Sequence, residues 1–400
     1  PRAARANLVA LAATAAALYA IQVVVGALQI FTTLAPWSVA LHLALGAVIW
    51  AILAATAVYS YCEARMARAE PLDSMGGRAP AEADVRAPTS TEPVATGLGP
   101  HGARSRTRAS AGDRVRAYVA LTKPRIVELL LVTTVPAMVL AARGIPRLDL
   151  IAWTLVGGAL AAGSANAINQ YLERDIDLLM SRTRRRPLPA QEVEPENALL
   201  FGLALGVAAF AELAVLVNLL SAFLALLAIA FYVVVYTILL KRSTPQNIVI
   251  GGAAGSLPPV IGWAAVTGDV ALPALLLFAI VFYWTPPHFW ALSLRLARDY
   301  RAAGVPMLPV VHGIPETTRQ IALYSVLLVA LTMIFFAVAG MNLIYLVGAL
   351  ALGAIFIYQS FAMWHEGSER RAVRLYRYST TYLAALFALM AIDVLVPLAF

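Results

Sequence analysis

The chain has 400 residues, of which 61 % are hydrophobic and only 13 % charged, and its formal net charge is +8. Soluble domains are about 45–50 % apolar and about 25 % charged, so this composition excludes a soluble enzyme, a disordered tail and a collagen-like rod. It predicts an integral, multi-pass membrane protein whose helices contact the lipid bilayer. The single cysteine, Cys62, excludes both an intramolecular disulfide and a cysteine metal cluster.

Apolar runs of about 20 residues, the length that spans a bilayer, recur along the chain. The first run is too long for the apolar region of a signal peptide, so no signal peptide is expected. We predict eleven spanning helices, at 7–33, 36–62, 125–142, 149–172, 197–218, 219–240, 246–265, 271–294, 320–340, 341–362 and 379–399.

Residues 63–116 interrupt this pattern, because they are rich in Pro, Gly, Ala, Ser and Arg and show no apolar period. Such a segment buries too little apolar surface to fold, so it predicts a disordered linker. The sequence therefore predicts an all-α membrane protein in three parts: a two-helix hairpin at 1–62, the linker at 63–116, and a nine-helix bundle at 117–400.

Basic residues alternate between successive loops of the predicted bundle, and cytoplasmic loops carry the excess of Lys and Arg. This pattern places the linker and the basic loops in the cytoplasm and Phe400 outside, in a plasma or inner membrane. It also explains the positive charge without a nucleic-acid partner. The basic residues that set the orientation are Arg174, Arg182, Arg184, Arg185, Arg186, Lys241, Arg242, the loop 295–319, Arg370, Arg371, Arg374 and Arg377.

Acidic residues accompany the arginines of the first basic loop. Asn169, Glu173 and Asp177 lie at i, i+4 and i+8, which on a helix gives one polar stripe about 12 Å long. Asp175 falls on the opposite face and should serve another purpose. Two carboxylates and an amide oxygen in one stripe suit Mg²⁺ shared with substrate phosphates, which the arginines could clamp. The alternative is an acidic patch at a helix end, paired with the arginines expected there.

A second polar loop follows a predicted span near residue 285. Pro286 and Pro287 are expected to interrupt this span, as happens where backbone lines a cavity. A simple helix kink followed by loop arginines is the alternative. Because both loops lie on one side of the membrane, we predict that they form two jaws of an anion-binding site. The second jaw would contain His288, Arg295, Arg298, Asp299 and Tyr300.

Three further residues are candidates for substrate contact, but each has an alternative explanation that is at least as good. Lys123 and Arg125 begin the first span of the bundle, where contact with lipid headgroups is as good an explanation as substrate binding. Imidazole binds haem iron, which makes His288 a candidate haem contact, although a hydrogen-bonded structural histidine is the alternative.

Several long strings of the sequence resemble a known family. The stripe NQYLERDID with the following RTRRRP is similar to the first Asp-rich motif of the UbiA-type membrane prenyltransferases. The strings LTKPRIVELLLVTT, LKRSTPQNIVIGGAAGSLPPVIGW, WTPPHFWALSL and DYRAAGVPMLPVV resemble the branch of that family that farnesylates protohaem IX.

The resemblance implies a nine-helix bundle that holds farnesyl diphosphate through Mg²⁺ and transfers the farnesyl group to a vinyl group of protohaem IX. The product would be haem O, a precursor of the haem A of cytochrome oxidase. By the same resemblance, Asn169, Glu173 and Asp177 hold the Mg²⁺–diphosphate and Asp299 belongs to a second acidic site. The implied substrate-binding residues are Lys123, Arg125, Arg182, Arg184, Arg186, His288, Arg295, Arg298 and Tyr300.

The sequence departs from the family pattern at two positions. Glu173 stands where Asp is usual, and its longer arm can still bind a metal. Asp299 has no acidic partner four residues away, because Arg295 and Ala303 occupy those positions. The second jaw is therefore expected to bind diphosphate mainly through arginines.

The predicted N-terminal hairpin has a different resemblance. Residues 20–53 resemble the C-terminal helix pair of haem A synthase, and His42 matches the haem-ligating histidine of that family. A lone histidine is a weak haem candidate, so a remnant of a gene fusion is the preferred interpretation. The resemblance makes haem A synthase a candidate partner.

Two other functions fit part of the pattern. An aromatic prenyltransferase of quinone biosynthesis would share the first motif but would not explain the string TPPHFWAL. A secondary transporter of an anion could also use broken helices and basic residues, but its site is expected near the bilayer midplane. The polar clusters of this chain are predicted at cytoplasmic helix ends, which disfavours the transporter.

Overall fold

The computed structural model describes residues 13–14, 16–18, 21 and 110–396, with the side chains of residues 125–131 excepted. The chain divides into two compact units, Pro1–Ser105 and Arg106–Phe400, and the fold given below is that of the second unit. Most of the predicted hairpin, including His42, and the linker before residue 110 lie outside the described residues.

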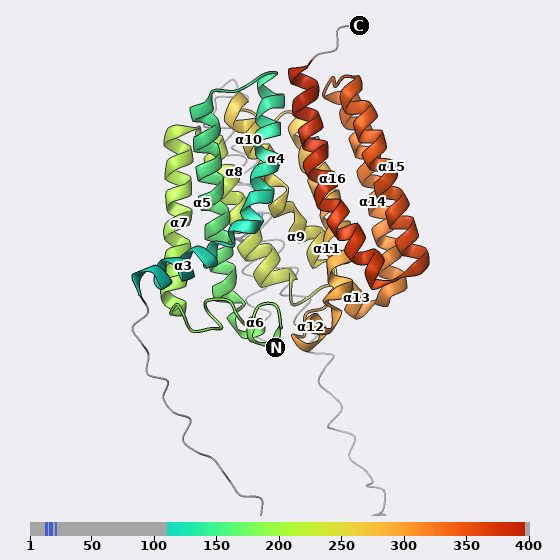
Figure 1. Ribbon diagram of the computed structural model, residues 1–400. Coiled ribbons are helices and arrows are strands. Elements are labelled where there is room, and N and C mark those ends of the chain that lie inside the picture. The colour runs from blue at the N-terminus through green and yellow to red at the C-terminus, as the bar shows by residue number, and fades with distance from the viewer. Residues whose placement is uncertain (1–12, 15, 19–20, 22–109, 397–400) are drawn as a thin grey trace, which may run out of the picture. The chain divides into compact units, whose positions relative to one another are not determined.

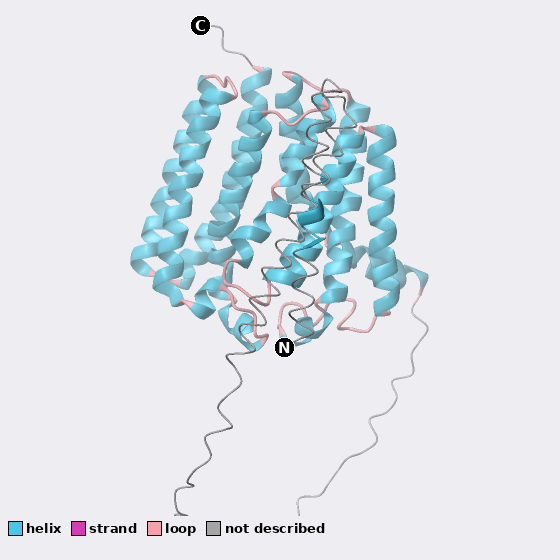
Figure 2. Ribbon diagram, turned by 180° about the vertical axis from the view of Figure 1, so that it is seen from behind, coloured by secondary structure: helices cyan, strands magenta, loops and turns pink. Residues whose placement is uncertain are grey.

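Residues 110–396 form helices joined by mostly short connections, of which the one at 180–194 is the longest, and no strand occurs in this part of the chain (Figures 1 and 2). The helices are α3 (Ala111–Thr122), α4 (Pro124–Ala142), α5 (Leu148–Leu172), α6 (Arg174–Leu179), α7 (Pro195–Leu216), α8 (Leu219–Ala230), the π-helix η1 (Phe231–Leu240), α9 (Asn247–Gly255), α10 (Leu257–Thr267), α11 (Leu272–Arg295), α12 (Ala297–Ala302), α13 (Leu308–Val311), α14 (Gly313–Val338), α15 (Leu343–Glu366) and α16 (Glu369–Leu395).

The predicted fold class is confirmed. Eight helical stretches in the described residues are long and apolar enough to cross a membrane, with α8 continuing into η1 and α9 into α10 as single spans. The 19-residue helix α4 packs among them, which makes nine long helices in residues 110–396. The short helices α6, α12 and α13 lie together at one end of the bundle (Figure 1).

Two predicted spans begin earlier than expected. Helix α14 begins at Gly313 instead of residue 320, and α16 begins at Glu369 instead of residue 379. Ser368 caps α16 by accepting a hydrogen bond from the backbone N–H of Arg371. Since this cap starts the helix before its apolar stretch, the arginines at 370–377 lie on helical turns and not in a loop.

Helix α11 is not interrupted at its two prolines, contrary to the prediction. It runs without a break from Leu272 to Arg295 with Pro286 and Pro287 inside it. Proline removes a backbone donor, and spanning helices tolerate this loss where side chains and neighbouring helices satisfy backbone groups. The two prolines leave the carbonyls of Phe282 and Tyr283 without their helical N–H donors. The hydroxyl of Thr285 donates at 2.8 Å to the carbonyl of Val281, the residue before Phe282.

The predicted linker also ends earlier than expected. Residues 111–116, which the sequence assigned to the linker, form the first turns of α3. A capping box begins this helix, because Ser110 accepts from the Asp113 N–H while the Asp113 carboxylate accepts from the Ser110 N–H. Local capping therefore orders a segment whose composition alone indicates disorder.

Small residues let the helices that carry the site pack closely. A Cβ added at Gly202 of α7 would lie 2.7 Å from Ile168 of α5, and one added at Gly251 of α9 would lie 2.3 Å from the Tyr236 ring of η1. Such contacts are typical of helix packing inside membranes, where small residues allow close backbone approach. They hold α5, α7, η1 and α9 in fixed register at the end of the bundle where the polar residues gather.

Candidate active site

The predicted polar stripe lies at the end of α5. Glu173 leaves the helical conformation, with φ −101° and ψ 5°, and separates α5 from α6. The hydrogen-bond pattern nevertheless continues, from the Glu173 N–H to the Asn169 carbonyl and from the Asp177 N–H to the Glu173 carbonyl, both at 2.9 Å. Asn169, Glu173 and Asp177 are all buried, at 1 %, 2 % and 1 % exposure.

Each of these three side chains contacts a basic side chain. Lys123 Nζ donates to Asn169 Oδ1 at 2.9 Å. Lys241 Nζ forms an ion pair with Glu173 Oε1. Arg186 Nη1 contacts both carboxylate oxygens of Asp177, at 2.9 and 2.7 Å. The result is a compact cluster of two carboxylates, one amide and three basic side chains, which we call the polar cluster.

Burial and neighbouring charges set the protonation of this cluster. Burial, followed by the repulsion of Arg186, lowers the pKa of Lys123 to about 7. Burial alone would raise the pKa of Glu173, but the charges of Lys241 and Lys123 and the Lys241 hydrogen bond together hold that pKa below its usual range. The cluster therefore keeps a buried carboxylate ionised beside a lysine that loses its proton easily.

The backbone at Lys123 is unusual. This residue has a left-handed conformation, with φ 52° and ψ 62°, and it ends α3 and begins α4. Only a few per cent of residues other than glycine have positive φ, and functional sites are enriched in them. Two polar residues of α5 hold this corner, since Asn166 Nδ2 donates to the Thr122 carbonyl at 3.0 Å and Gln170 Nε2 to the Leu121 carbonyl at 2.8 Å.

Lys241 directly follows the π-helix η1 and joins the cluster through Glu173. Its side chain lies near Tyr236, with Nζ 5.8 Å from the ring centroid, and the hydroxyl of Thr237 contacts Asn169. Thr237 and Lys241 are four residues apart, a spacing that puts both on the side of η1 that faces α5. The sequence indicated only a basic loop at Lys241, because its partner Glu173 is 68 residues away.

The second predicted jaw meets the first. Asp299 of α12 accepts a hydrogen bond from the Ser181 hydroxyl at 2.7 Å. Tyr300 is buried in an apolar cluster with Ile176 and Met180, which come from the first loop. The two loops are therefore brought together, but the two predicted arginines of the second jaw remain at its rim. Arg298 is exposed, and Arg295 forms an exposed ion pair with Glu369 at 3.6 Å.

Other predicted arginines lie at different depths. Arg186 is half-buried in the polar cluster, whereas Arg182 and Arg184 are exposed on the loop before it. Arg125 lies in the first turn of α4, and its side chain is outside the described residues.

His288 is held inside the bundle. Its ring is 5 % exposed, stacks on Trp284 with centroids 4.3 Å apart, and lies 2.7 Å through Nδ1 from the Ser379 hydroxyl. The Ser379 hydroxyl donates its only hydrogen to the Tyr376 carbonyl at 2.7 Å. With the hydroxyl hydrogen on that carbonyl, a neutral His288 donates through Nδ1 and has an unprotonated Nε2. The hydrogen-bonded histidine that the sequence offered as an alternative is thus present, with one lone pair unused by this bond.

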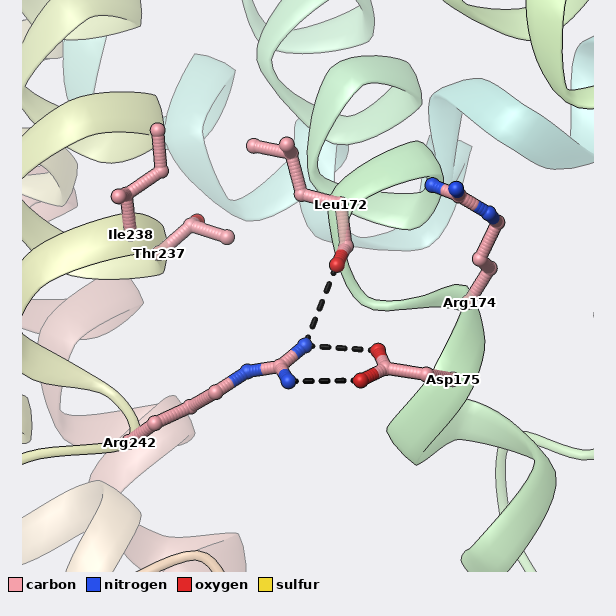
Figure 3. Close-up of a pocket in the computed structure, with 6 residues that line it drawn as sticks. All are labelled: Leu172, Arg174, Asp175, Thr237, Ile238 and Arg242. Atoms are coloured by element: carbon pink, nitrogen blue, oxygen red, sulfur yellow. Dashed lines mark hydrogen bonds and ion pairs between the residues drawn. The ribbon is translucent and has the colours of Figure 1, made fainter.

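Asp175 lies apart from the stripe, as its helical position predicts. Arg242 donates to both of its carboxylate oxygens at 2.7 Å and to the Leu172 carbonyl at 3.2 Å (Figure 3). The guanidinium hydrogen bond holds the pKa of Asp175 below its usual range. This pair borders an open pocket of about 430 Å³, lined by Leu172, Arg174, Asp175, Thr237, Ile238 and Arg242.

The polar cluster supplies some of the oxygen ligands that Mg²⁺ needs, but not a complete set. No group of three or more His, Cys, Asp or Glu side chains gathers as a metal site among the described residues. Mg²⁺, however, is usually held by one or two carboxylates together with substrate phosphates and water. The buried oxygens of Asn169, Glu173 and Asp177 provide this donor set on consecutive turns, so the residues fit a metal that arrives with a diphosphate.

A bundle of membrane-spanning helices with buried carboxylates and basic side chains at one end defines an integral, multi-pass membrane protein with a buried polar site. The sequence belongs to a known group of such proteins, because the model of the UbiA prenyltransferase family matches residues 130–389. The chain is a member of this family and is a prenyltransferase.

Two curated relatives are similar to this chain over more than nine-tenths of their own length. The chain is 56 % identical over 286 residues to "Protoheme IX farnesyltransferase" of Parafrankia sp. (strain EAN1pec), covering 71 % of this chain and 91 % of the relative. It is 53 % identical over 291 residues to the protein of the same name from Gloeobacter violaceus, covering 72 % and 95 %.

Solved structures support the fold. A structure of digeranylgeranylglyceryl phosphate synthase is similar with a TM-score of 0.60 at 16 % identity, covering 70 % of this chain and 99 % of the other. The apo structure of a UbiA homologue from Aeropyrum pernix K1 is similar with a TM-score of 0.56 at 20 % identity, covering 67 % and 98 %. At these identities the similarity concerns the fold alone.

Proposed function

We propose that this chain transfers the farnesyl group of farnesyl diphosphate to a vinyl group of protohaem IX, which gives haem O. The relatives named for this reaction are 56 % and 53 % identical over more than nine-tenths of their length. The observation in the structure that best supports the proposal is the pairing of every oxygen side chain of the polar cluster with a basic side chain. In a Mg²⁺–diphosphate, the Mg²⁺ can bind the oxygen side chains and the negative phosphate oxygens can bind the basic side chains.

In this proposal Asn169, Glu173 and Asp177 hold the Mg²⁺ that accompanies the diphosphate. Lys241 and Arg186 then turn from the carboxylates to the phosphate oxygens, and Lys123 follows when protonated. Mg²⁺, when bound, helps to neutralise the charge that grows on the departing diphosphate. The basic side chains stabilise the same charge from positions that the fold has already fixed.

The reaction needs no serine or cysteine nucleophile. The allylic carbon–oxygen bond of farnesyl diphosphate breaks and its electron pair leaves with the diphosphate. The vinyl group of protohaem then forms a carbon–carbon bond with the allylic carbon, water adds to the resulting cation, and a proton is released. The role of the chain is to bind the diphosphate, to orient the two substrates and to stabilise charge.

The second jaw is proposed to close the site. Asp299, held by Ser181, and the buried Tyr300 lie on the loop that meets the first jaw. Arg298, Arg182 and Arg184 are exposed and free to attract the diphosphate from solution. His288, with an unprotonated Nε2, is proposed to contact the haem.

We also propose that this end of the bundle faces the cytoplasm of a plasma or inner membrane. The polar cluster, the arginines of the first loop and the basic first turns of α16 lie towards one side of the spans. Cytoplasmic ends of membrane proteins carry such an excess of basic residues. Farnesyl diphosphate would then reach the site from the aqueous side.

The acceptor is tested by competition. The purified full-length chain is incubated with farnesyl diphosphate, Mg²⁺ and a mixture of protohaem IX, 4-hydroxybenzoate and dihydroxynaphthoate, and the products are identified by mass spectrometry. Haem O as the farnesylated product supports the proposal. A prenylated aromatic acid without haem O would instead indicate a quinone-pathway enzyme.

A further inference from the structure

A continuous hydrogen-bond chain reaches Asn169 from η1. Thr237 Oγ1 donates to the Tyr232 carbonyl at 2.9 Å, Asn169 Nδ2 donates to Thr237 Oγ1 at 3.1 Å, and Lys123 Nζ donates to Asn169 Oδ1 at 2.9 Å. Thr237 and Asn169 are 3 % and 1 % exposed, so water does not compete for these bonds.

The donors and acceptors in this chain allow one arrangement of the Asn169 amide. A threonine hydroxyl has a single hydrogen, and Thr237 gives it to the Tyr232 carbonyl. Its oxygen can therefore only accept from Asn169, which requires the NH₂ end of the amide. The Thr237 contact thus turns Oδ1 towards the polar cluster. Lys123 requires the same orientation when it is protonated, because an ammonium has donors only.

The π-helix explains why Thr237 can do this. In an α-helix a threonine hydroxyl bonds to the carbonyl three or four residues before it. Thr237 reaches the carbonyl five residues before it, which follows from the i to i+5 spacing of η1. This leaves the acceptor side of the hydroxyl directed at α5, where Asn169 lies.

We propose that Thr237 is a positioning residue for the metal site, because it locks the Asn169 amide with its oxygen towards the Mg²⁺–diphosphate. The inference rests on the proposed function, in which Asn169 is a metal ligand. A rotated amide would present N–H donors to the cation and would repel it. Residues that orient metal ligands in this way commonly change metal affinity when they are replaced.

The test measures metal binding directly. Mn²⁺ binding to the full-length chain in detergent, with an unreactive thiol analogue of farnesyl diphosphate, is followed by electron paramagnetic resonance. Thr237→Val keeps the shape but removes the acceptor, and it should weaken Mn²⁺ binding about tenfold. Thr237→Ser keeps the hydroxyl and should restore binding. If Thr237→Val does not fold, Thr237→Ala serves in its place.

Two control experiments distinguish a role of Thr237 in orienting Asn169 from a role in packing alone. Thr154→Val removes another fully buried hydroxyl, which bonds only the Leu150 carbonyl of its own helix, and should bind Mn²⁺ as the wild type does. In an Asn169→Ala background, Thr237→Val should cause no further loss, since Thr237 acts through Asn169.

The outcomes are distinct. Wild-type binding by Thr237→Val, or an added loss in the Asn169→Ala background, overturns the positioning role and leaves the proposed function intact. A wild-type chain that binds no Mn²⁺ with the analogue overturns the metal site of the proposed function and this inference with it.

Discussion

Lys241, at the end of the π-helix η1, forms a buried ion pair with Glu173, at the joint between α5 and α6. The side chains are 15 % and 2 % exposed. Removing one partner of such a pair leaves a charge that is both desolvated and uncompensated. The pair therefore joins the end of η1 to the end of α5. It also keeps the Lys241 ammonium at the place where we expect the diphosphate to bind.

Lys241→Met should abolish most of the activity and destabilise the fold by about 3 kcal/mol, because Glu173 loses its counter-ion. The double variant Lys241→Met/Glu173→Gln should recover stability but not haem O formation. Arg242→Met is the matched control, since the Arg242–Asp175 pair is 42 % and 60 % exposed and should contribute less than about 1 kcal/mol. Thermal unfolding in detergent and turnover are measured for all three. Equal losses from Lys241→Met and Arg242→Met would argue against a special role for the buried pair.

Asp393 supports the opposite half of the bundle. Its carboxylate is fully buried in α16 and accepts from the backbone N–H groups of Asn342 at 2.6 Å and Tyr345 at 2.9 Å, at the start of α15. Asp393→Ala leaves both donors without this partner and should cost about 3 kcal/mol. Asp269→Ala, in the exposed loop before α11, should leave the unfolding temperature unchanged. A small effect of Asp393→Ala would mean that other groups or water cap α15.

The capping box of α3 predicts a pH dependence. The Ser110 side-chain and backbone hydrogen bonds hold the pKa of Asp113 below its usual range. A carboxyl with a lowered pKa in the folded state stabilises it above the ordinary pKa, near 4, and this contribution is lost as the pH falls through the lowered value. Hydrogen exchange of residues 111–116, corrected for intrinsic rates, should therefore quicken in acid. Ser110→Ala should already exchange faster at pH 7, and a pH-independent wild type would contradict the prediction.

The start of α3 decides where a shortened protein should begin if it is to test whether the preceding residues are needed for activity. A protein that starts at Ser110 keeps the whole capping box and should form haem O. One that starts at Tyr118 lacks the first turns of α3 and should lose activity, because α3 positions the Lys123 that follows it, whose side chain holds Asn169. Turnover and thermal unfolding are compared with the full-length chain. A folded but inactive protein starting at Ser110 would show that the preceding residues contribute to function.

Much of this architecture is readable from the sequence, because apolar length predicts spans and a four-residue spacing places Asn169, Glu173 and Asp177 together. The separate position of Asp175 follows from the same period. The contacts of Thr237 with Asn169 and of Lys241 with Glu173 could not be predicted, since each joins segments 68 residues apart and no local pattern marks it. The continuity of α11 through Pro286 and Pro287 and the early start of α16 depend on caps and neighbouring helices, which a hydropathy pattern does not contain.

The most direct test of the central claim is the initial rate of haem O formation by Asp177→Asn and Asp175→Asn, measured by mass spectrometry beside the wild type. Asp177 is buried in the polar cluster, whereas Asp175, two residues away, is 60 % exposed. With protohaem, farnesyl diphosphate and Mg²⁺, we expect haem O from the wild type and from Asp175→Asn, and a rate at least about 100-fold lower from folded Asp177→Asn. A folded wild type that forms no haem O, or an Asp177→Asn variant with the wild-type rate, would contradict the account.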